Sequence, residues 1–221
     1  MHRSSKPPWL LLSAALAVLA ASFVSHGSSA QVRGQGSRPF SRTEQHVLDT
    51  GGLVVRSVTK QRGSLRLVGG ASWQVINLPP EAVFRAVLDA DRYPRMLPRV
   101  VESHVVARHG TERIVLVRHA AGPVAARYYL RTNVYQDRKD LTFTLDERRP
   151  HDIRAAWGFF AVRPYRNGKS VLSYGVMTDI GEGVVTGLFR GQVHEWILRV
   201  PWTIKKYIEG RGRQRYLVAS R

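Results

Sequence analysis

Residues 76–98 read INLPPEAVFRAVLDADRYPRMLP and decide how the rest of the chain folds. Pro80 and Glu81 are typical of a helix start, because proline lacks an amide hydrogen that the first turn would leave unpaired and an acid favours the positive end of the helix dipole. The apolar residues that follow share one helical face: Val83, Phe84, Val87 and Leu88. The segment Arg92–Leu97 then predicts a second short helix. Asp91 precedes it as a capping residue, and Pro98 ends it.

Strand-like segments lie on both sides of these two helices. Upstream, β-branched residues gather in 53–59, 64–68 and 72–77. Downstream, alternating or largely apolar segments predict six or so consecutive antiparallel strands: 101–107, 113–119, 125–135, 141–145, 154–164 and 170–178. Arg166-Asn167-Gly168 is a strong hairpin signal between the last two segments. A long antiparallel meander with one apolar face must bend around another apolar element.

The C-terminal region supplies that element as one long predicted helix. Its apolar stripe has helical period and comprises Phe189, Val193, Trp196, Ile197, Val200, Ile204, Tyr207 and Ile208. Pro201 interrupts the stripe and lacks a backbone donor, so we expect a kink or a break near 199–201. The sequence therefore predicts an α+β fold, in which a curved antiparallel β-sheet wraps around a long C-terminal α-helix and two short helices follow the first strand.

The segment quoted above resembles the opening of START-like (SRPBCC) proteins, the superfamily of polyketide cyclases, coenzyme-Q-binding START-type proteins and Bet v 1-like birch-pollen allergens. Its most specific part is the pattern Asp-x-x-x-Tyr-Pro-x-x-Leu-Pro at 89–98, and the resemblance extends over roughly residues 72–210. It implies a helix-grip fold around a deep cavity for lipids, quinones, sterols or polyketides. Because most members lack a catalytic apparatus, it implies binding more than turnover.

The N-terminus reads as a secretory signal peptide over residues 1–30. Basic residues precede the short apolar run WLLLSAALAVLAA at 9–21, and small residues lead to predicted cleavage after Ala30. We therefore expect a periplasmic or secreted protein. The remaining chain divides into a flexible linker at 31–50, an N-terminal strand extension at 51–71, the START-like helix-grip domain at 72–212 and a basic tail at 213–221.

Composition excludes several classes of function. The chain of 221 residues has no cysteine, which excludes a disulfide scaffold, a zinc ribbon, an iron–sulfur site and a thiol nucleophile. The histidines read as surface residues without metal-ligand spacing, and no phosphate loop or dinucleotide fingerprint occurs, so we predict no metal and no cofactor. The formal net charge of +18 suggests an anionic partner or merely an arginine-rich genome. Export argues against nucleic acid as a partner, and the oligomeric state is not predictable.

If the resemblance holds, aromatic and aliphatic residues from several segments line a ligand-binding cavity. Taken singly, each of these side chains is more often part of an ordinary core than a ligand contact, and a one-residue slip of a strand would reverse which face points inward. The candidates are Phe84, Leu88, Tyr93, Met96, Tyr128, Leu130, Phe143, Trp157, Phe159, Tyr174, Met177, Phe189, Val193, Trp196 and Ile197.

Four functions remain open. The leading hypothesis is a carrier or sequestering protein for a hydrophobic small molecule such as a lipid or quinone, whose C-terminal helix opens at a hinge near Pro201. The second is an aromatase or cyclase, which requires inward-facing polar groups such as Arg118, Tyr128 or Asp152. The third is transient docking on an anionic membrane surface through Trp202, Lys205 and Lys206, against the alternative of a solvated basic helix end. The fourth is a structural role with a solid core.

Overall fold

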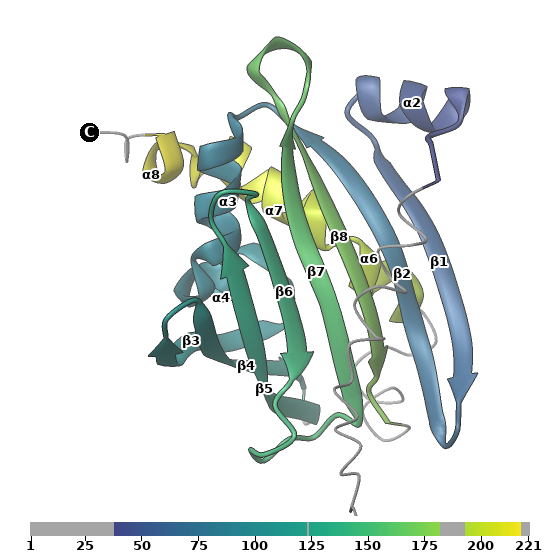
Figure 1. Cartoon of the computed structure of the whole chain (residues 1–221), viewed down its shortest axis with the longest axis vertical. Coiled ribbons are helices and arrows are strands. Elements are labelled where there is room, and N and C mark those ends of the chain that lie inside the picture. The colour runs from purple at the N-terminus through teal and green to yellow at the C-terminus, as the bar shows by residue number, and fades with distance from the viewer. Residues whose placement is uncertain (1–37, 123, 182–192, 218–221) are drawn as a thin grey trace, which may run out of the picture.

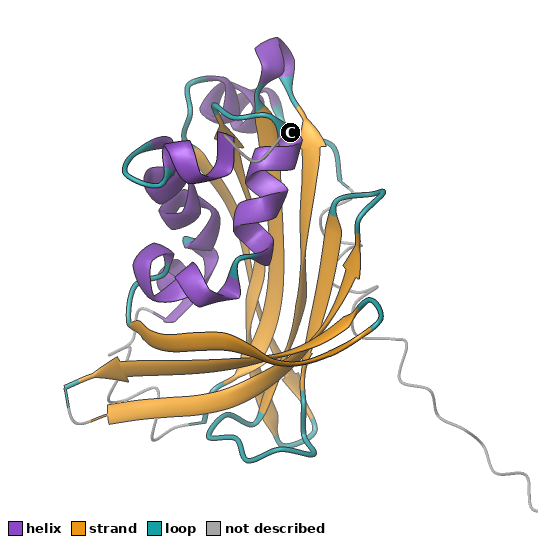
Figure 2. Ribbon diagram, turned by 90° about the vertical axis from the view of Figure 1, so that its left-hand side faces the viewer, coloured by secondary structure: helices purple, strands orange, loops and turns teal. Residues whose placement is uncertain are grey.

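The computed structural model describes residues 38–122, 124–181 and 193–217. Its strands form one antiparallel sheet in the order β1-β2-β8-β7-β6-β5-β4-β3, and Figure 1 shows this sheet twisted and curved. Figure 2 shows most of the helical residues on one side of the strands. The strands are β1 (Leu53–Arg62), β2 (Leu65–Ile76), β3 (Val100–His109), β4 (Glu112–Ala121), β5 (Val124–Tyr135), β6 (Asp140–Leu145), β7 (Ala155–Pro164) and β8 (Ser170–Asp179). The helices are α2 (Arg42–Asp49), α3 (Pro80–Leu88), α4 (Tyr93–Met96), α6 (Val193–Leu198), α7 (Val200–Glu209) and α8 (Arg213–Leu217), with 3-10 turns at Ala90–Arg92 and Arg166–Gly168.

The two helices predicted from residues 76–98 are present as α3 and α4. The proline at the start of α3 occupies its first turn, and the carbonyl of Pro79 accepts hydrogen bonds from the amides of Ala82 and Val83. The apolar face of α3 is buried in the main core, where it meets β7, β8 and α7. The sequence predicted that these helices follow the first strand. They follow the second, since both β1 and β2 precede α3 and belong to the same sheet.

The upstream strands are fewer and longer than the sequence predicted. The segments at 64–68 and 72–77 are one continuous strand, β2, which pairs with β1 on one side and β8 on the other. Gly69 and Gly70 lie between them with φ of +154° and +135°, and a Cβ on either would strike the carbonyl oxygen of a neighbouring strand. The two glycines break the β-branched pattern in the sequence, which is why two strands were predicted. In the structure they let the neighbouring backbones approach closely, and the strand continues through them.

The predicted long C-terminal helix is divided into shorter helices, and the expected break is confirmed. Helix α6 ends at Leu198, and α7 starts at Val200 with Pro201 in its first turn. The ring has no amide hydrogen to continue the ladder of hydrogen bonds, so the chain restarts as a new helix. The sheet still packs on the C-terminal region, because Ile204 and Ile208 of α7 are fully buried in the main core.

The flexible linker predicted at 31–50 is wrong for residues 42–49, which form α2. Ser41 and Glu44 make a capping box, in which the Ser41 hydroxyl accepts from the Glu44 amide and the Glu44 carboxylate accepts from the Ser41 amide. Arg56 on β1 donates to both Glu44 oxygens and to the carbonyls of Arg38 and Pro39. Its hydrogen bond and charge lower the pKa of Glu44 to about 2.

The basic tail predicted from residue 213 is likewise wrong for its first residues, which form α8 against α3. Tyr216 is buried, and its hydroxyl donates to the Asp89 carboxylate at a distance of 3.0 Å. Arg215 pairs with the same carboxylate at 2.9 Å, and Arg85 donates to the Tyr216 carbonyl. The start of the basic segment is thus a docked helix, and Asp89, which directly follows α3, supplies the countercharge.

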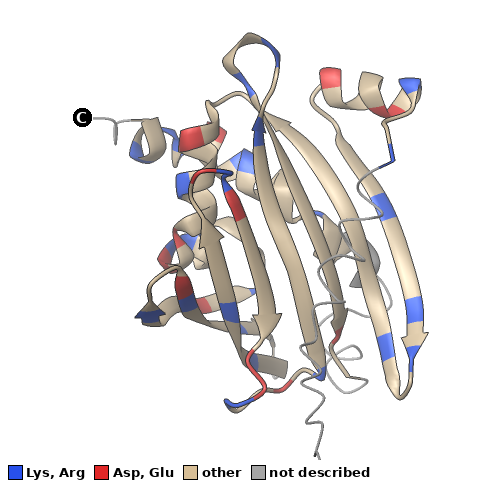
Figure 3. Ribbon diagram, in the orientation of Figure 1, with Lys and Arg blue, Asp and Glu red and all other residues tan. Residues whose placement is uncertain are grey.

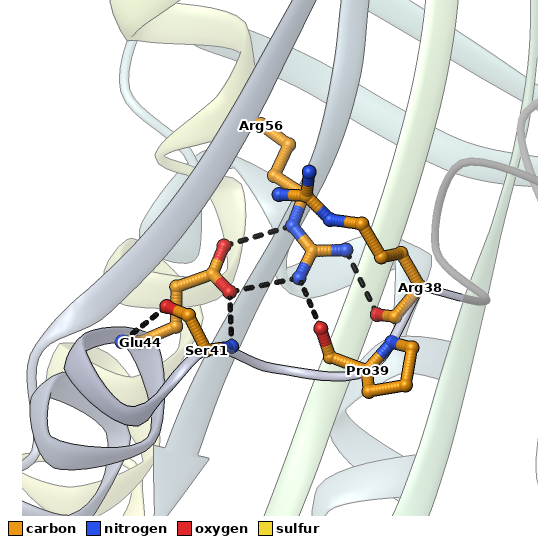
Figure 4. Close-up of polar contacts among 5 residues, drawn as sticks. All are labelled: Arg38, Pro39, Ser41, Glu44 and Arg56. Carbon is orange, nitrogen blue, oxygen red and sulfur yellow. Dashed lines mark hydrogen bonds and ion pairs between the residues drawn. The ribbon is translucent and has the colours of Figure 1, made fainter.

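Basic residues are spread over many elements. Figure 3 shows Lys and Arg on helices, strands and loops, with acids among them. Several arginines have acidic partners, including Arg163 with Asp140 at 2.6 Å and Arg131 with Asp146 at 3.0 Å. Figure 4 shows the Arg56 and Glu44 pair that joins α2 to the sheet. None of the helices in the described residues is long and apolar enough to cross a membrane.

Gly158 of β7 is expected to tolerate no side chain. A Cβ there would lie 2.1 Å from the Gly175 carbonyl oxygen and 2.5 Å from Cζ of Phe143. We predict that Gly158→Ala lowers the free energy of unfolding by about 3 kcal/mol, because backbone and ring must both move. Gly110→Asn is the control, since Gly110 has open space and a left-handed φ that asparagine adopts. Urea denaturation compares the two variants, and equal effects would contradict this role of Gly158.

Candidate ligand-binding cavity

Two neighbouring strands build the wall of a cavity on the concave face of the sheet. On β4, alternate residues from Arg113 to His119 point to this face, and on β5 alternate residues from Ala126 to Thr132 do the same. The antiparallel register places Arg113 opposite Thr132 and His119 opposite Ala126. Because side chains of paired residues share a face, the two rows form one continuous wall.

The cavity has a volume of about 160 Å³. Its lining is predominantly apolar, with valines, leucines and aromatic rings from the sheet, α3, α4, α6 and the residues beside them. Figures 1 and 2 show α3, α4, α6 and α7 on the concave side of the curved sheet. This composition suits a hydrophobic molecule, because removing its apolar surface from water lowers the free energy of the complex.

The structure brings many of the candidates named from the sequence to this cavity. Those that line it are Leu88, Tyr93, Tyr128, Leu130, Phe143, Tyr174, Trp196 and Ile197. Phe84 and Met96 are instead buried in the adjoining core, so the prediction that they line the cavity is wrong. Phe189 lies outside the described residues, and Val193 starts α6 without a described side chain. Whether the lining residues contact a ligand stays a prediction.

Trp157, Phe159 and Met177 were assigned to the wrong face. They pack with Leu67 and Ala155 in a separate cluster on the other side of the sheet, while neighbouring residues of β7 and β8 line the cavity. Strands β7 and β8 are apolar on both faces, so their sequences carry no alternation from which to read the inward face.

His119 lines the cavity, which corrects its assignment to the surface. Its Nε2 lies 2.9 Å from the hydroxyl of Tyr128, and Nδ1 is buried without a hydrogen-bond partner. The Trp196 ring meets the imidazole edge-on at 6.3 Å between centroids. Burial among these groups lowers the pKa of His119 to about 4, so the imidazole is neutral at pH 7. The sequence signal that could have placed His119 on this face is its alternation along β4 with Val115 and Val117, which point the same way.

The remaining hydroxyl groups of the cavity are mostly bonded to the backbone. Thr132 donates to the Arg113 carbonyl, Thr178 to the Ala155 carbonyl and Tyr93 to the Val87 carbonyl. Burial raises the pKa of Tyr128 and Tyr174 above the usual range, which keeps both phenols protonated. The cavity therefore has few polar groups free to orient a ligand.

Two of the three acid–base candidates considered for a cyclase do not face the cavity. Arg118 is exposed on the opposite face of β4, and Asp152 is exposed and accepts a hydrogen bond from the Arg127 amide. Only Tyr128 has the required orientation. Among the described residues, no three His, Asp or Glu side chains gather closely enough to hold a metal ion.

The candidates for hinge and membrane contact have different surroundings. Pro201 is buried at the start of α7, at the break between the two helices. Trp202 is 42% exposed, with the Lys206 ammonium 5.4 Å from the centre of a Trp202 ring. Lys205 instead donates to the Val75 carbonyl at 2.6 Å and pairs with Glu209, so its inclusion in a free docking surface is wrong. Hinge motion and membrane contact stay predictions.

Residues 76–200 match the family model described as polyketide cyclase / dehydrase and lipid transport. The chain belongs to this family. The match covers more than half of the sequence, and it includes α3, α4 and every strand from β3 to β8. No curated protein matches this member of the polyketide cyclase and lipid transport family.

Solved structures agree with the family fold. A protein from Thermus thermophilus is 20% identical, with a TM-score of 0.54 over 68% of this chain and 98% of that one. The Zhui aromatase/cyclase from Streptomyces sp. R1128 is 12% identical, with a TM-score of 0.52 over 70% and 98%. A STAR-related lipid transfer protein from Xanthomonas axonopodis is 11% identical, with a TM-score of 0.50 over 69% and 98%. At these identities the likeness establishes the helix-grip fold alone.

The neutral His119 predicts a loss of stability in acid. Its pKa is about 4 in the folded chain against an ordinary value of 6.5, so the unfolded chain takes up the proton first as the pH falls. The stabilisation is complete above pH 6.5 and is lost progressively between 6.5 and 4. We expect this loss to be about 1–3 kcal/mol smaller in His119→Gln, measured by urea denaturation at pH 7 and near pH 4. His104→Gln, on the exposed surface, is the control; identical pH dependence in all three proteins would contradict a buried His119.

Proposed function

We propose that this protein binds a hydrophobic small molecule, such as a lipid or quinone, in the cavity between the sheet and the helices and carries or sequesters it. The observation that supports this proposal is the predominantly apolar lining of that cavity, with alternate residues of β4 and β5 pointing into it. Burying a hydrocarbon there would contribute about 0.8 kcal/mol for each methylene group.

The proposal includes export. Residues 1–30 have the basic start, short apolar run and small-residue exit of a signal peptide, although they lie outside the described residues. When the chain is expressed in a bacterium with a periplasm, we expect a processed protein beginning at Gln31 in the periplasmic fraction. Intact-mass measurement decides this, because removal of residues 1–30 lowers the mass by a defined amount. A full-length chain retained in the cytoplasm would contradict export.

An enzyme of the cyclase type is the second candidate, and the contact between His119 and Tyr128 is the observation that favours it. A neutral imidazole can accept a proton and a phenol can donate one, and both groups lie inside the apolar cavity. The two functions differ in the fate of the bound molecule. A carrier returns it unchanged, whereas a cyclase converts it, and the conversion would fail in Tyr128→Phe.

Filling the cavity tests the binding function directly. Leu130 is half-buried in the middle of the wall, and we predict that Leu130→Trp occupies the space that the ligand needs. Wild-type protein purified without detergent should release an apolar molecule in about one-to-one amount on solvent extraction, identified by mass spectrometry. Leu130→Trp should release little of it while remaining folded.

The matched control is Val55→Trp, which adds the same ring at a β1 position that is 44% exposed and outside the cavity. It should release as much ligand as the wild type. A wild-type protein that contains no apolar molecule and takes up none of a panel of lipids and quinones would contradict the proposed function.

A further inference from the structure

The cavity contains one charged side chain among its described lining residues, that of Arg113. Arg113 is the second residue of β4, at the opposite end of its inward row from His119. Six residues of extended strand separate the two, which corresponds to roughly 20 Å. The cavity wall is therefore polar at both ends and apolar between them, but only one end has a charge.

No acid within the described residues pairs with this guanidinium. The neighbouring Glu112 points to the other face of the sheet, where its carboxylate lies 3.7 Å from Arg131. The hydroxyl of Thr132, opposite Arg113 in the pairing, donates to the backbone carbonyl of Arg113 and supplies no negative charge. Other arginines on the sheet have such partners, as Arg163 has Asp140 and Arg56 has Glu44.

The surroundings of the Arg113 guanidinium disfavour its positive charge. Desolvation is the main cause that lowers the pKa of Arg113, and the charge of Arg108, which faces it across the β3–β4 pair, adds to it. A guanidinium presents a planar fork of donors that suits carboxylate and phosphate oxygens. An anion at this position would offset the desolvation and complete the hydrogen bonds of Arg113.

We propose that Arg113 is the anion-binding residue of the cavity, and that the bound molecule is an amphipathic anion with a carboxylate or phosphate head and a hydrocarbon body. The head pairs with Arg113, and the body lies along the Val115 and Val117 row towards His119 and Tyr128. This inference rests on the proposed function, and it adds the chemical class of the ligand.

The test compares four probes that share one hydrocarbon chain: dodecanoic acid, dodecyl phosphate, methyl dodecanoate and dodecanol. Dissociation constants are measured by calorimetry on purified protein from which bound lipid has been removed. We expect wild-type protein to bind at least one of the two anions about 10- to 100-fold more tightly than the ester and the alcohol, the range of a charged hydrogen bond. Which anion binds better identifies the head as carboxylate or phosphate.

Three variants separate the charge of Arg113 from its place in the fold. Arg113→Met should reduce anion binding to the level of the ester and leave ester binding within about threefold, while Arg113→Lys should retain part of the preference. Arg118→Met removes a cation from the exposed face of the same strand and should behave as the wild type. Thermal melting of each variant shows whether it folds.

Two results would overturn the inference. Equal binding of acids and ester by the wild type would reject an anionic ligand while leaving hydrophobic binding intact, and this comparison needs no variant to fold. An anion preference that persists in a folded Arg113→Met would assign recognition to another residue. If none of the four probes nor any other apolar molecule binds, the proposed function itself fails.

Discussion

The register in which β4 pairs with β5 determines what the cavity contains. With Arg113 opposite Thr132, the inward row of β4 carries Arg113 and His119, and the row of β5 carries Tyr128 and Leu130. A slip of one residue would turn one of the two strands over, so that Tyr129 would replace Tyr128 in the wall if β5 were the strand that turned. Helix α7, whose first residue Val200 lines the cavity, is held independently, because Lys205 and Glu209 bond to the backbone at the end of β2 while Ile204 and Ile208 fill the core. A strand register and a helix anchor together define one enclosed space.

The helix-grip fold was predictable because its signals are local. The Pro80 start, the apolar face of α3 and the alternation along β4 to β6 each depend on a few neighbouring residues. Apart from α2, whose capping box is a local signal, the main errors concern features that depend on tertiary structure. The inward faces of β7 and β8 could not be read, because both faces are apolar, and α8 looked like a solvated tail because its partner Asp89 lies far away in the sequence. His119 was missed for the same reason: a histidine among valines indicates a cavity only when the cavity is known.

The polar groups of the cavity fall into two classes. Thr132, Thr178 and Tyr93 donate to backbone carbonyls, so they satisfy the protein's own groups and present little to a ligand. His119 and Tyr128 contact each other, but together they carry two mobile protons and need only one for their mutual hydrogen bond. If the Tyr128 hydroxyl donates to Nε2, the proton of the imidazole lies on Nδ1; if Nε2 donates instead, Nδ1 has a lone pair. In both cases Nδ1 is buried without a hydrogen-bond partner in this structure. The pair can therefore adapt to a donor or an acceptor, whereas an arginine can only donate.

The large positive charge of the sequence carries less functional information than the position of one residue, Arg113. The basic residues are distributed over many helices, strands and loops (Figure 3), and many contact an acid, a carbonyl or an aromatic ring, as Arg138 does with Tyr135 and Arg215 with Asp89. Such contacts are worth little individually when water surrounds them. The Arg113 guanidinium faces an apolar cavity and has no acidic partner among the described residues, so water and acids weaken its attraction for an anion less than they do on the open surface. The net charge is thus compatible with many partners, while Arg113 discriminates among the molecules that fit the cavity.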